Sequence, residues 1–183
     1  LPVRVPLAWK FWISCPMWKL LWCPWAAAAC WPVWPFAIKS LRPDVKIYGV
    51  QAAGAASMYN AYRDHTYETL DHVDTFADGI AVKTPGETTF KMIEQYVDGI
   101  VTVSEDEIAA AILALMENQK LVAEGAGATP VAAALFGKLP IEGKKTVCLI
   151  SGGNIDVNIL SRVITRGMIM SGRKTNLMIA PGG

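Results

Sequence analysis

An apolar run that ends in a small hydroxyl residue and two glycines constrains this chain more than any other stretch. Residues 146–150 are typical of a buried strand, and Ser151, Gly152 and Gly153 follow directly. A helical pattern comes next, with an apolar face made of Ile155, Ile159, Val163 and Ile164. Open α/β sheets bind ligands beyond the carboxyl ends of their strands, where an uncharged hydroxyl can donate or accept one hydrogen bond. An ordinary turn after a strand fits the same pattern equally well.

Strand and helix patterns alternate from residue 36 to residue 165. Strands are predicted at 46–50, 100–103 and 146–150. Helices are predicted at 36–41, 58–62, 88–96, 105–120, 130–136 and 154–165. Ser104 and Glu107 form a capping box, so we interpret the acidic run 104–107 as a helix start rather than as paired catalytic carboxylates. The alternation predicts an α/β fold with a largely parallel sheet and flanking helices.

Composition separates the first 35 residues from the rest. The net charge is +1, so nothing indicates a nucleic-acid partner. All seven tryptophans lie between Trp9 and Trp34, and residues 1–43 contain neither glycine nor an acidic residue. Cysteine spacing gives neither a disulfide framework nor a zinc site, and Cys148 is expected to be a small buried residue of a strand.

Several interpretations of the tryptophan-rich segment compete. Residues 20–38 carry no charge and are just long enough to span a membrane, which would make the chain a non-enzymatic membrane-associated protein. The alanines before Cys30 also suit a secretory or lipoprotein signal, and a buried core helix is a third possibility. Pro24, Pro32 and Pro35 each remove a helix hydrogen bond and oppose all three interpretations.

Three motifs occur together and in a set order. They are residues 76–82 (FADGIAV), 122–128 (VAEGAGA) and 151–156 (SGGNID). Together they resemble the second half of the pyridoxal-phosphate-dependent threonine dehydratases, which are serine/threonine ammonia-lyases of the tryptophan-synthase β-like family. The resemblance runs from about Phe36 to Lys174, and it implies part of a fold-type-II catalytic domain.

The resemblance implies an activity and its setting. The parent enzyme would be a lyase of amino-acid metabolism, in isoleucine biosynthesis or threonine catabolism. It would use pyridoxal 5'-phosphate to dehydrate and deaminate L-threonine or L-serine, which gives 2-oxobutanoate or pyruvate and ammonia. A cytoplasmic homo-oligomer with a small amino-acid substrate is expected, with no nucleic-acid or membrane partner.

The resemblance also implies roles for individual residues. Ser151 would meet the pyridine nitrogen of the cofactor, and Asp78 would lie near the substrate. The other residues expected to bind the cofactor are Gly79, Glu124, Gly152 and Gly153. The lysine that forms the Schiff base in the family is expected upstream of Leu1. No catalytic residue is therefore expected in this chain, and the chain alone is expected to be inactive.

The resemblance further suggests that residues 1–35 are translated out of frame. Tryptophan has a single codon, and a one-nucleotide shift allows a sequence with a helix pattern, a β-branched strand and a glycine-rich loop. In the family, that loop binds the cofactor phosphate. Its place is taken here by Ala26, Ala27, Ala28 and Ala29. An alanine Cβ blocks positive φ and close approach, so we expect a degraded phosphate loop, although the alanine run also suits an ordinary piece of helix.

These interpretations divide the chain into three parts. Residues 1–35 are the aberrant segment, which is expected to pack poorly, and residues 36–172 are part of the catalytic domain. Residues 173–183 are a linker with the truncated start of a regulatory domain. Some relatives bind a divalent metal with acidic residues where this chain has Gln51 and Ser57. Hard cations prefer carboxylates, so no metal is expected here.

Overall fold

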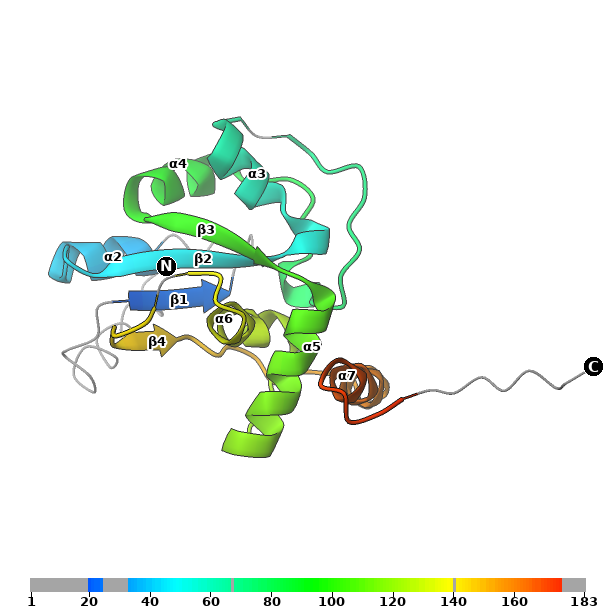
Figure 1. Ribbon diagram of the computed structural model, residues 1–183. Coiled ribbons are helices and arrows are strands. Elements are labelled where there is room, and N and C mark those ends of the chain that lie inside the picture. The colour runs from blue at the N-terminus through cyan, green and yellow to red at the C-terminus, as the bar shows by residue number, and fades with distance from the viewer. Residues whose placement is uncertain (1–19, 25–32, 67, 140, 176–183) are drawn as a thin grey trace, which may run out of the picture.

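The computed structural model describes residues 20–24, 33–66, 68–139 and 141–175. The core of this part of the chain is a sheet of four parallel strands in the order β3-β2-β1-β4 (Figure 1). The strands are β1 (Leu20–Pro24), β2 (Lys46–Ala52), β3 (Gly99–Val103) and β4 (Thr146–Cys148). Because all pairs are parallel, the carboxyl ends of the strands meet at one edge of the sheet.

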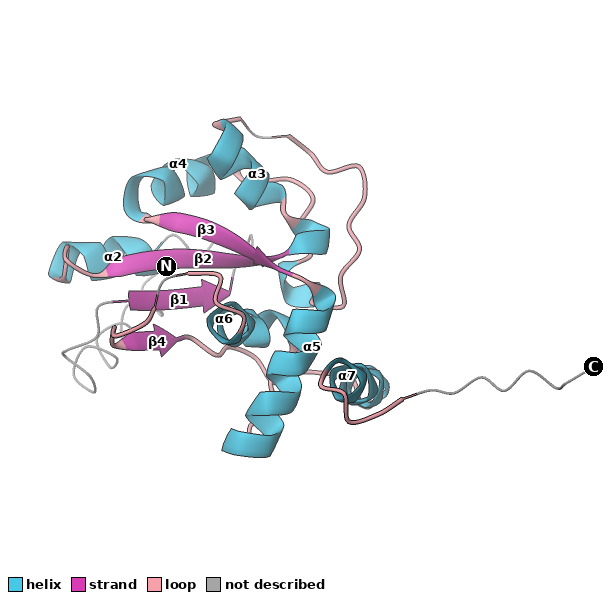
Figure 2. Ribbon diagram, in the orientation of Figure 1, coloured by secondary structure: helices cyan, strands magenta, loops and turns pink. Residues whose placement is uncertain are grey.

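Six α-helices and three short helical turns are described around this sheet (Figure 2). The α-helices are α2 (Val33–Leu41), α3 (Ser57–Asp64), α4 (Glu87–Tyr96), α5 (Glu105–Ala114), α6 (Gly125–Leu135) and α7 (Val157–Met170). The 3-10 turns are η1 (Ala53–Ala55) and η2 (Asp78–Ile80), and the π-helical turn η3 (Leu115–Gln119) extends α5. The α/β fold class and the parallel sheet with flanking helices are thus confirmed.

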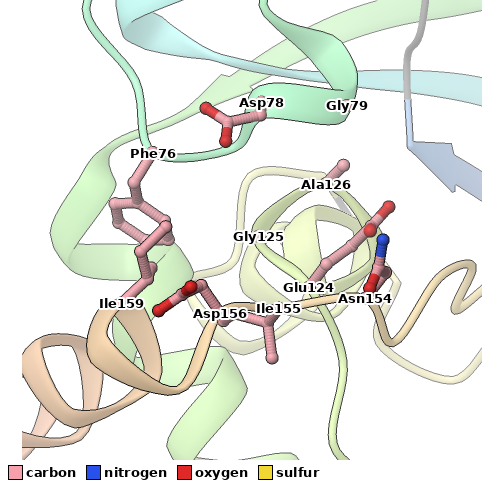
Figure 3. A pocket seen from close by; sticks show the side chains of 10 residues that line it. All are labelled: Phe76, Asp78, Gly79, Glu124, Gly125, Ala126, Asn154, Ile155, Asp156 and Ile159. Carbon is pink, nitrogen blue, oxygen red and sulfur yellow. The ribbon is translucent and has the colours of Figure 1, made fainter.

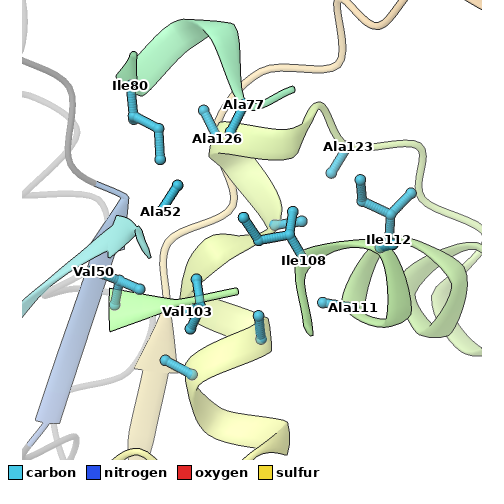
Figure 4. Packing of buried hydrophobic residues seen from close by; sticks show 14 of the residues in the cluster. Val50, Ala52, Ala77, Ile80, Val103, Ile108, Ala111, Ile112, Ala123 and Ala126 are labelled. Atoms are coloured by element: carbon cyan, nitrogen blue, oxygen red, sulfur yellow. The ribbon is translucent and has the colours of Figure 1, made fainter. Parts of the chain in front are cut away.

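Alternating side chains of β2 face two different layers of helices. Ile47 packs in a cluster with Trp34 and Ile38 of α2. Val50 and Ala52 belong to the larger core, which also contains buried residues of α5 and α6 (Figure 4). Successive residues of a strand point to opposite faces, so helices cover both faces of the sheet. Alanines in α6 let this helix approach the sheet closely, and α5 and α7 pack outside it.

Most predicted elements are confirmed, and two boundaries are wrong. β2, β3, α4 and the helix through residues 105–120 lie where the patterns placed them. β4 stops at Cys148 rather than at residue 150, because its pairing with β1 ends at Trp22. α7 begins at Val157 rather than at residue 154, because Asp156 is its N-cap and accepts a hydrogen bond from the Asn158 N–H at 2.7 Å.

The helix predicted at 130–136 begins five residues earlier, at Gly125. The glycine-rich stretch was interpreted as a turn, but it forms the first turn of α6. Pro130 has no N–H to donate to the Ala126 carbonyl four residues before it. The Thr129 hydroxyl donates to that carbonyl instead, at 2.9 Å, and its side chain is fully buried. This local substitution lets the helix include a proline.

The segment 1–35 contributes to the domain rather than standing apart from it. β1 lies between β2 and β4, and the proposed boundary at residue 35 falls inside α2. The expectation of poor packing is wrong for Trp34, which is 7% exposed and belongs to the α2 cluster. Among the described residues, no helix is both long and apolar enough to cross a bilayer.

Candidate functional site

A pocket opens at the carboxyl edge of the sheet, where three segments far apart in sequence meet (Figure 3). They are η2, the N-terminus of α6 and the stretch that leads into α7. The lining residues are Phe76, Asp78, Gly79, Glu124, Gly125, Ala126, Asn154, Ile155, Asp156 and Ile159. The pocket holds about 150 Å³, which is less than the roughly 300–1,000 Å³ of small-molecule sites. The described residues therefore form part of a larger site.

Glycine is required where the Ser151–Gly153 turn passes the start of α6. The Glu124 N–H donates to the Gly152 carbonyl at 3.2 Å. Gly152 has φ +79°, and a Cβ at this position would lie 2.3 Å from Oε1 of Glu124. A Cβ on Gly127 would lie 1.9 Å from the Ser151 carbonyl oxygen. These contacts place the Ser151 turn directly on the N-terminus of α6.

Gly79 and Gly125 permit a second close approach, between η2 and α6. A Cβ on Gly125 would lie 3.0 Å from Cα of Ala77 and 3.1 Å from Cδ2 of Phe76. A Cβ on Gly79 would lie 3.2 Å from the Ala126 Cβ and 3.3 Å from the Glu124 carboxylate. Two of the three motifs therefore meet at the N-terminus of α6, and Glu124 contacts both the η2 segment and the Ser151 turn.

Three carboxylates give the pocket its charge. Asp156 caps α7, while the side chains of Asp78 and Glu124 have no hydrogen-bond partner among the residues described. Gathered acidic groups favour a cation and oppose a second anion. This wall of the pocket suits an ammonium group and does not suit a phosphate.

The predicted site residues fall into three sets. Asp78, Gly79 and Glu124 line the pocket together. Ser151, Gly152 and Gly153 adjoin it through contacts with α6 but do not line it, and the Ser151 side chain is exposed. The expected phosphate loop, residues 26–29, lies outside the described residues.

Sequence reasoning missed several lining residues. Phe76 and Asn154 stand inside motifs that were already singled out, but no chemistry was assigned to them. Asp156 was also in a motif, and the N-cap signal of aspartate before an apolar helical pattern was available to identify it. Ile159 was assigned to the apolar face of a helix, and the structure shows that this face also closes the pocket.

The position where some relatives bind a metal is occupied by a buried amide. Oε1 of Gln51 accepts a hydrogen bond from the Tyr59 N–H at 2.7 Å, and this bond ties the end of β2 to α3. Ser57 is also buried. No group of three His, Cys, Asp or Glu side chains suited to a metal ion occurs in the ranges that the structure describes.

The chain belongs to the family described as "Pyridoxal-phosphate dependent enzyme", whose sequence pattern matches residues 34–153. It is similar to the L-threonine ammonia-lyase of Thermotoga maritima, with 51% identity over 150 residues, which are 80% of this chain and 37% of the relative. It is also similar to the catabolic L-threonine dehydratase TdcB of Escherichia coli strain K12, with 43% identity over 129 residues, or 69% of this chain and 39% of that relative. The chain thus spans well under half the length of these relatives.

Solved structures show the same fold. The processed form of threonine deaminase isoform 2 from Solanum lycopersicum has a TM-score of 0.82 at 29% identity, with 89% of this chain and 48% of that chain covered. A bacterial threonine deaminase, from T.th., has a TM-score of 0.76 at 28% identity, with 84% and 57% covered. The described sheet and helices therefore form part of a larger domain of this fold.

The site fits one end of the family's cofactor. The exposed Ser151 hydroxyl has no hydrogen-bond partner in the described part of the chain, so it is free to meet a ring nitrogen. The acidic pocket beside it suits a cationic group rather than the cofactor phosphate. No lysine is among the residues that line the pocket within the described ranges.

Proposed function

We propose that this chain is part of a pyridoxal-phosphate-dependent threonine ammonia-lyase, which converts L-threonine, or L-serine, into a 2-oxoacid and ammonia. The observation that carries the proposal is the convergence of all three family motifs on the N-terminus of α6. The 51% identity to the Thermotoga maritima L-threonine ammonia-lyase supports the choice of substrate.

The proposal gives each described residue a task. The bound cofactor supplies a ring that withdraws electrons from the α-carbon of the substrate. Ser151 meets the ring nitrogen with a neutral hydroxyl, which leaves that nitrogen uncharged and favours β-elimination. Gly152, Gly153 and Gly79 let the backbone approach the flat ring, and the Glu124 carboxylate lies between them. Asp78 lies on the substrate side, where its negative charge attracts the substrate ammonium group.

The remaining groups come from other parts of the protein. The lysine that holds the cofactor lies upstream of Leu1, and the phosphate loop coincides with residues 26–29, where alanines replace glycines. Residues 36–172 then belong to the catalytic domain and residues 173–183 begin a regulatory domain. We further propose that the parent enzyme is a cytoplasmic homo-oligomer.

A chimera tests this function without relying on the first 35 residues. Residues 36–174 of this chain replace the corresponding segment of the Thermotoga maritima L-threonine ammonia-lyase, and release of 2-oxobutanoate is measured. We expect the chimera to deaminate threonine, while the 183-residue chain releases no 2-oxobutanoate. The unaltered relative serves as the control for assay and folding. A folded chimera that binds the cofactor but does not turn over threonine or serine would disprove the proposal.

A further inference from the structure

The first turn of α5 carries three consecutive acidic residues that bind three different segments. Asp106 pairs with Arg166 of α7, and this hydrogen bond raises the pKa of Arg166 above its ordinary value. Glu107 completes the capping box with Ser104 and pairs with Lys138 at 2.7 Å. Glu105 instead turns toward the loop before η2, where its Oε2 accepts the Phe76 N–H at 3.0 Å. Helix capping alone explains Glu107 but not Glu105.

The Glu105 carboxylate is arranged at a cost to stability. Its other oxygen, Oε1, is buried and has no hydrogen-bond partner among the described residues. A buried carboxylate oxygen without a donor is unfavourable, and such groups in folded proteins require an explanation. The bond to Phe76 is the one hydrogen bond that the described structure gives this side chain beyond its own helix.

Phe76 forms the wall between two neighbouring pockets. It lines the acidic pocket together with Asp78, and it lines a second pocket of about 250 Å³ with Ile159 and Arg166 of α7. Its ring lies against Gly125, where a Cβ would be 3.1 Å from Cδ2. In Figure 3 the Phe76 ring and the Ile159 side chain stand together on one side of the acidic pocket.

The loop that carries Phe76 is fixed at several backbone groups. Upstream, the Asp74 N–H donates to the Gly54 carbonyl at 3.0 Å, which ties the loop to the end of β2. The Ala77 N–H donates to Oγ1 of Thr75 within the loop itself, at 3.1 Å. The Glu105 bond therefore joins the loop to a different element, α5, immediately before Asp78 and Gly79.

We infer that Glu105 is a positioning residue, which holds the Phe76 backbone so that Phe76, Asp78 and Gly79 form the wall of the acidic pocket. Its effect on substrate binding rests on the proposed function, whereas its effect on the loop does not. Glu105 acts through the backbone and does not itself touch the pocket, because it is absent from the lining residues.

Hydrogen exchange on the full 183-residue chain tests the effect on the loop. Glu105→Ala is expected to accelerate amide exchange in peptides covering residues 74–80 by roughly tenfold, because the Phe76 N–H loses a charge-assisted partner. Glu105→Gln keeps an acceptor oxygen and is expected to restore most of the protection. Asp106→Ala removes a carboxylate from the same helical turn and is expected to leave exchange in this loop within about twofold of the wild type.

Equal exchange in the wild type and Glu105→Ala would overturn the inference, as would equal acceleration by Glu105→Ala and Asp106→Ala. Circular dichroism and exchange in the α4 peptides identify a variant that is globally unfolded, and in that case Glu105→Gln decides between the outcomes. It must protect the loop as the wild type does.

Kinetics of the chimera with the Thermotoga maritima enzyme test the effect on substrate. Glu105→Ala is expected to raise KM for threonine by roughly tenfold with a smaller change in kcat, and Glu105→Gln is expected to restore KM. An unchanged KM in an active chimera would contradict the positioning of the pocket wall. An inactive chimera would count against the proposed function, while the exchange result would still decide the role of Glu105 in the loop.

Discussion

The Glu124 carboxylate occupies the space that any side chain at Gly152 would need. A Cβ on Gly152 would lie 2.3 Å from Oε1 and 2.4 Å from Cδ of Glu124. The backbone of Glu124 also donates to the Gly152 carbonyl at 3.2 Å. Two residues that are 28 positions apart in the sequence are thus joined by both a hydrogen bond and a steric fit, and this contact fixes the Ser151 turn against α6.

Gly152→Ala is expected to destabilise the fold more than a glycine substitution at an open turn. The left-handed conformation alone costs alanine roughly 1–2 kcal/mol, and overpacking against Glu124 adds roughly 1–3 kcal/mol. Gly137→Ala is the matched control, because Gly137 has φ +61° but a Cβ there would have nothing within 4 Å. Free energies of unfolding from urea titrations measure both. Equal losses for the two variants would show that Glu124 does not fill this space.

Thr129→Val is expected to destabilise the chain by roughly 1–3 kcal/mol. The variant nearly preserves shape but leaves the Ala126 carbonyl without the hydroxyl that replaces the missing N–H of Pro130. Thr129→Ser keeps the hydroxyl and is expected to retain most of this stability. Urea unfolding of the three proteins provides the comparison, and a Val variant more stable than the Ser variant would contradict the role of the hydroxyl.

Asp98 is expected to make the fold sensitive to acid. Burial raises the pKa of Asp98, but hydrogen bonds from Lys39, Lys46 and the Ile47 N–H outweigh it and hold that pKa below the ordinary 3.8. A carboxyl with a lowered pKa in the folded state stabilises the protein above its unfolded pKa, and this stability is lost as the pH falls through the folded pKa. Asp98→Asn is therefore expected to be less stable than the wild type at pH 7, with a smaller difference below pH 3.8. Unfolding free energies across this range measure the effect, and a constant difference would refute it.

Ser151→Ala in the chimera is expected to lower kcat while cofactor binding persists. Losing one hydrogen bond to the ring nitrogen costs roughly 1 kcal/mol, which corresponds to about a fivefold lower rate. Ser161→Ala, on the exposed side of α7, is the control and is expected to have no effect. Visible absorbance of the bound cofactor and 2-oxobutanoate release separate binding from turnover. An unchanged kcat would remove Ser151 from the site.

Local signals in the sequence determined most of the elements and the family. The capping box of Ser104 and Glu107 sits at the start of α5 as predicted, because its hydrogen bonds join residues only three apart. β2 and β3 likewise follow from short runs of β-branched and aromatic residues. The three motifs in their order identified the family, which the match over residues 34–153 confirms.

Only the tertiary structure decided how those motifs meet. Gly127 looked like part of a turn, but it is a helical residue whose missing Cβ makes room for the Ser151 carbonyl. Glu105 looked like one more acid at a helix start, but its carboxylate binds a loop 29 residues away. Both misreadings have the same physical reason. Sequence patterns record the conformation of neighbouring residues, whereas a close approach or a long-range hydrogen bond depends on where another segment lies after the sheet has assembled.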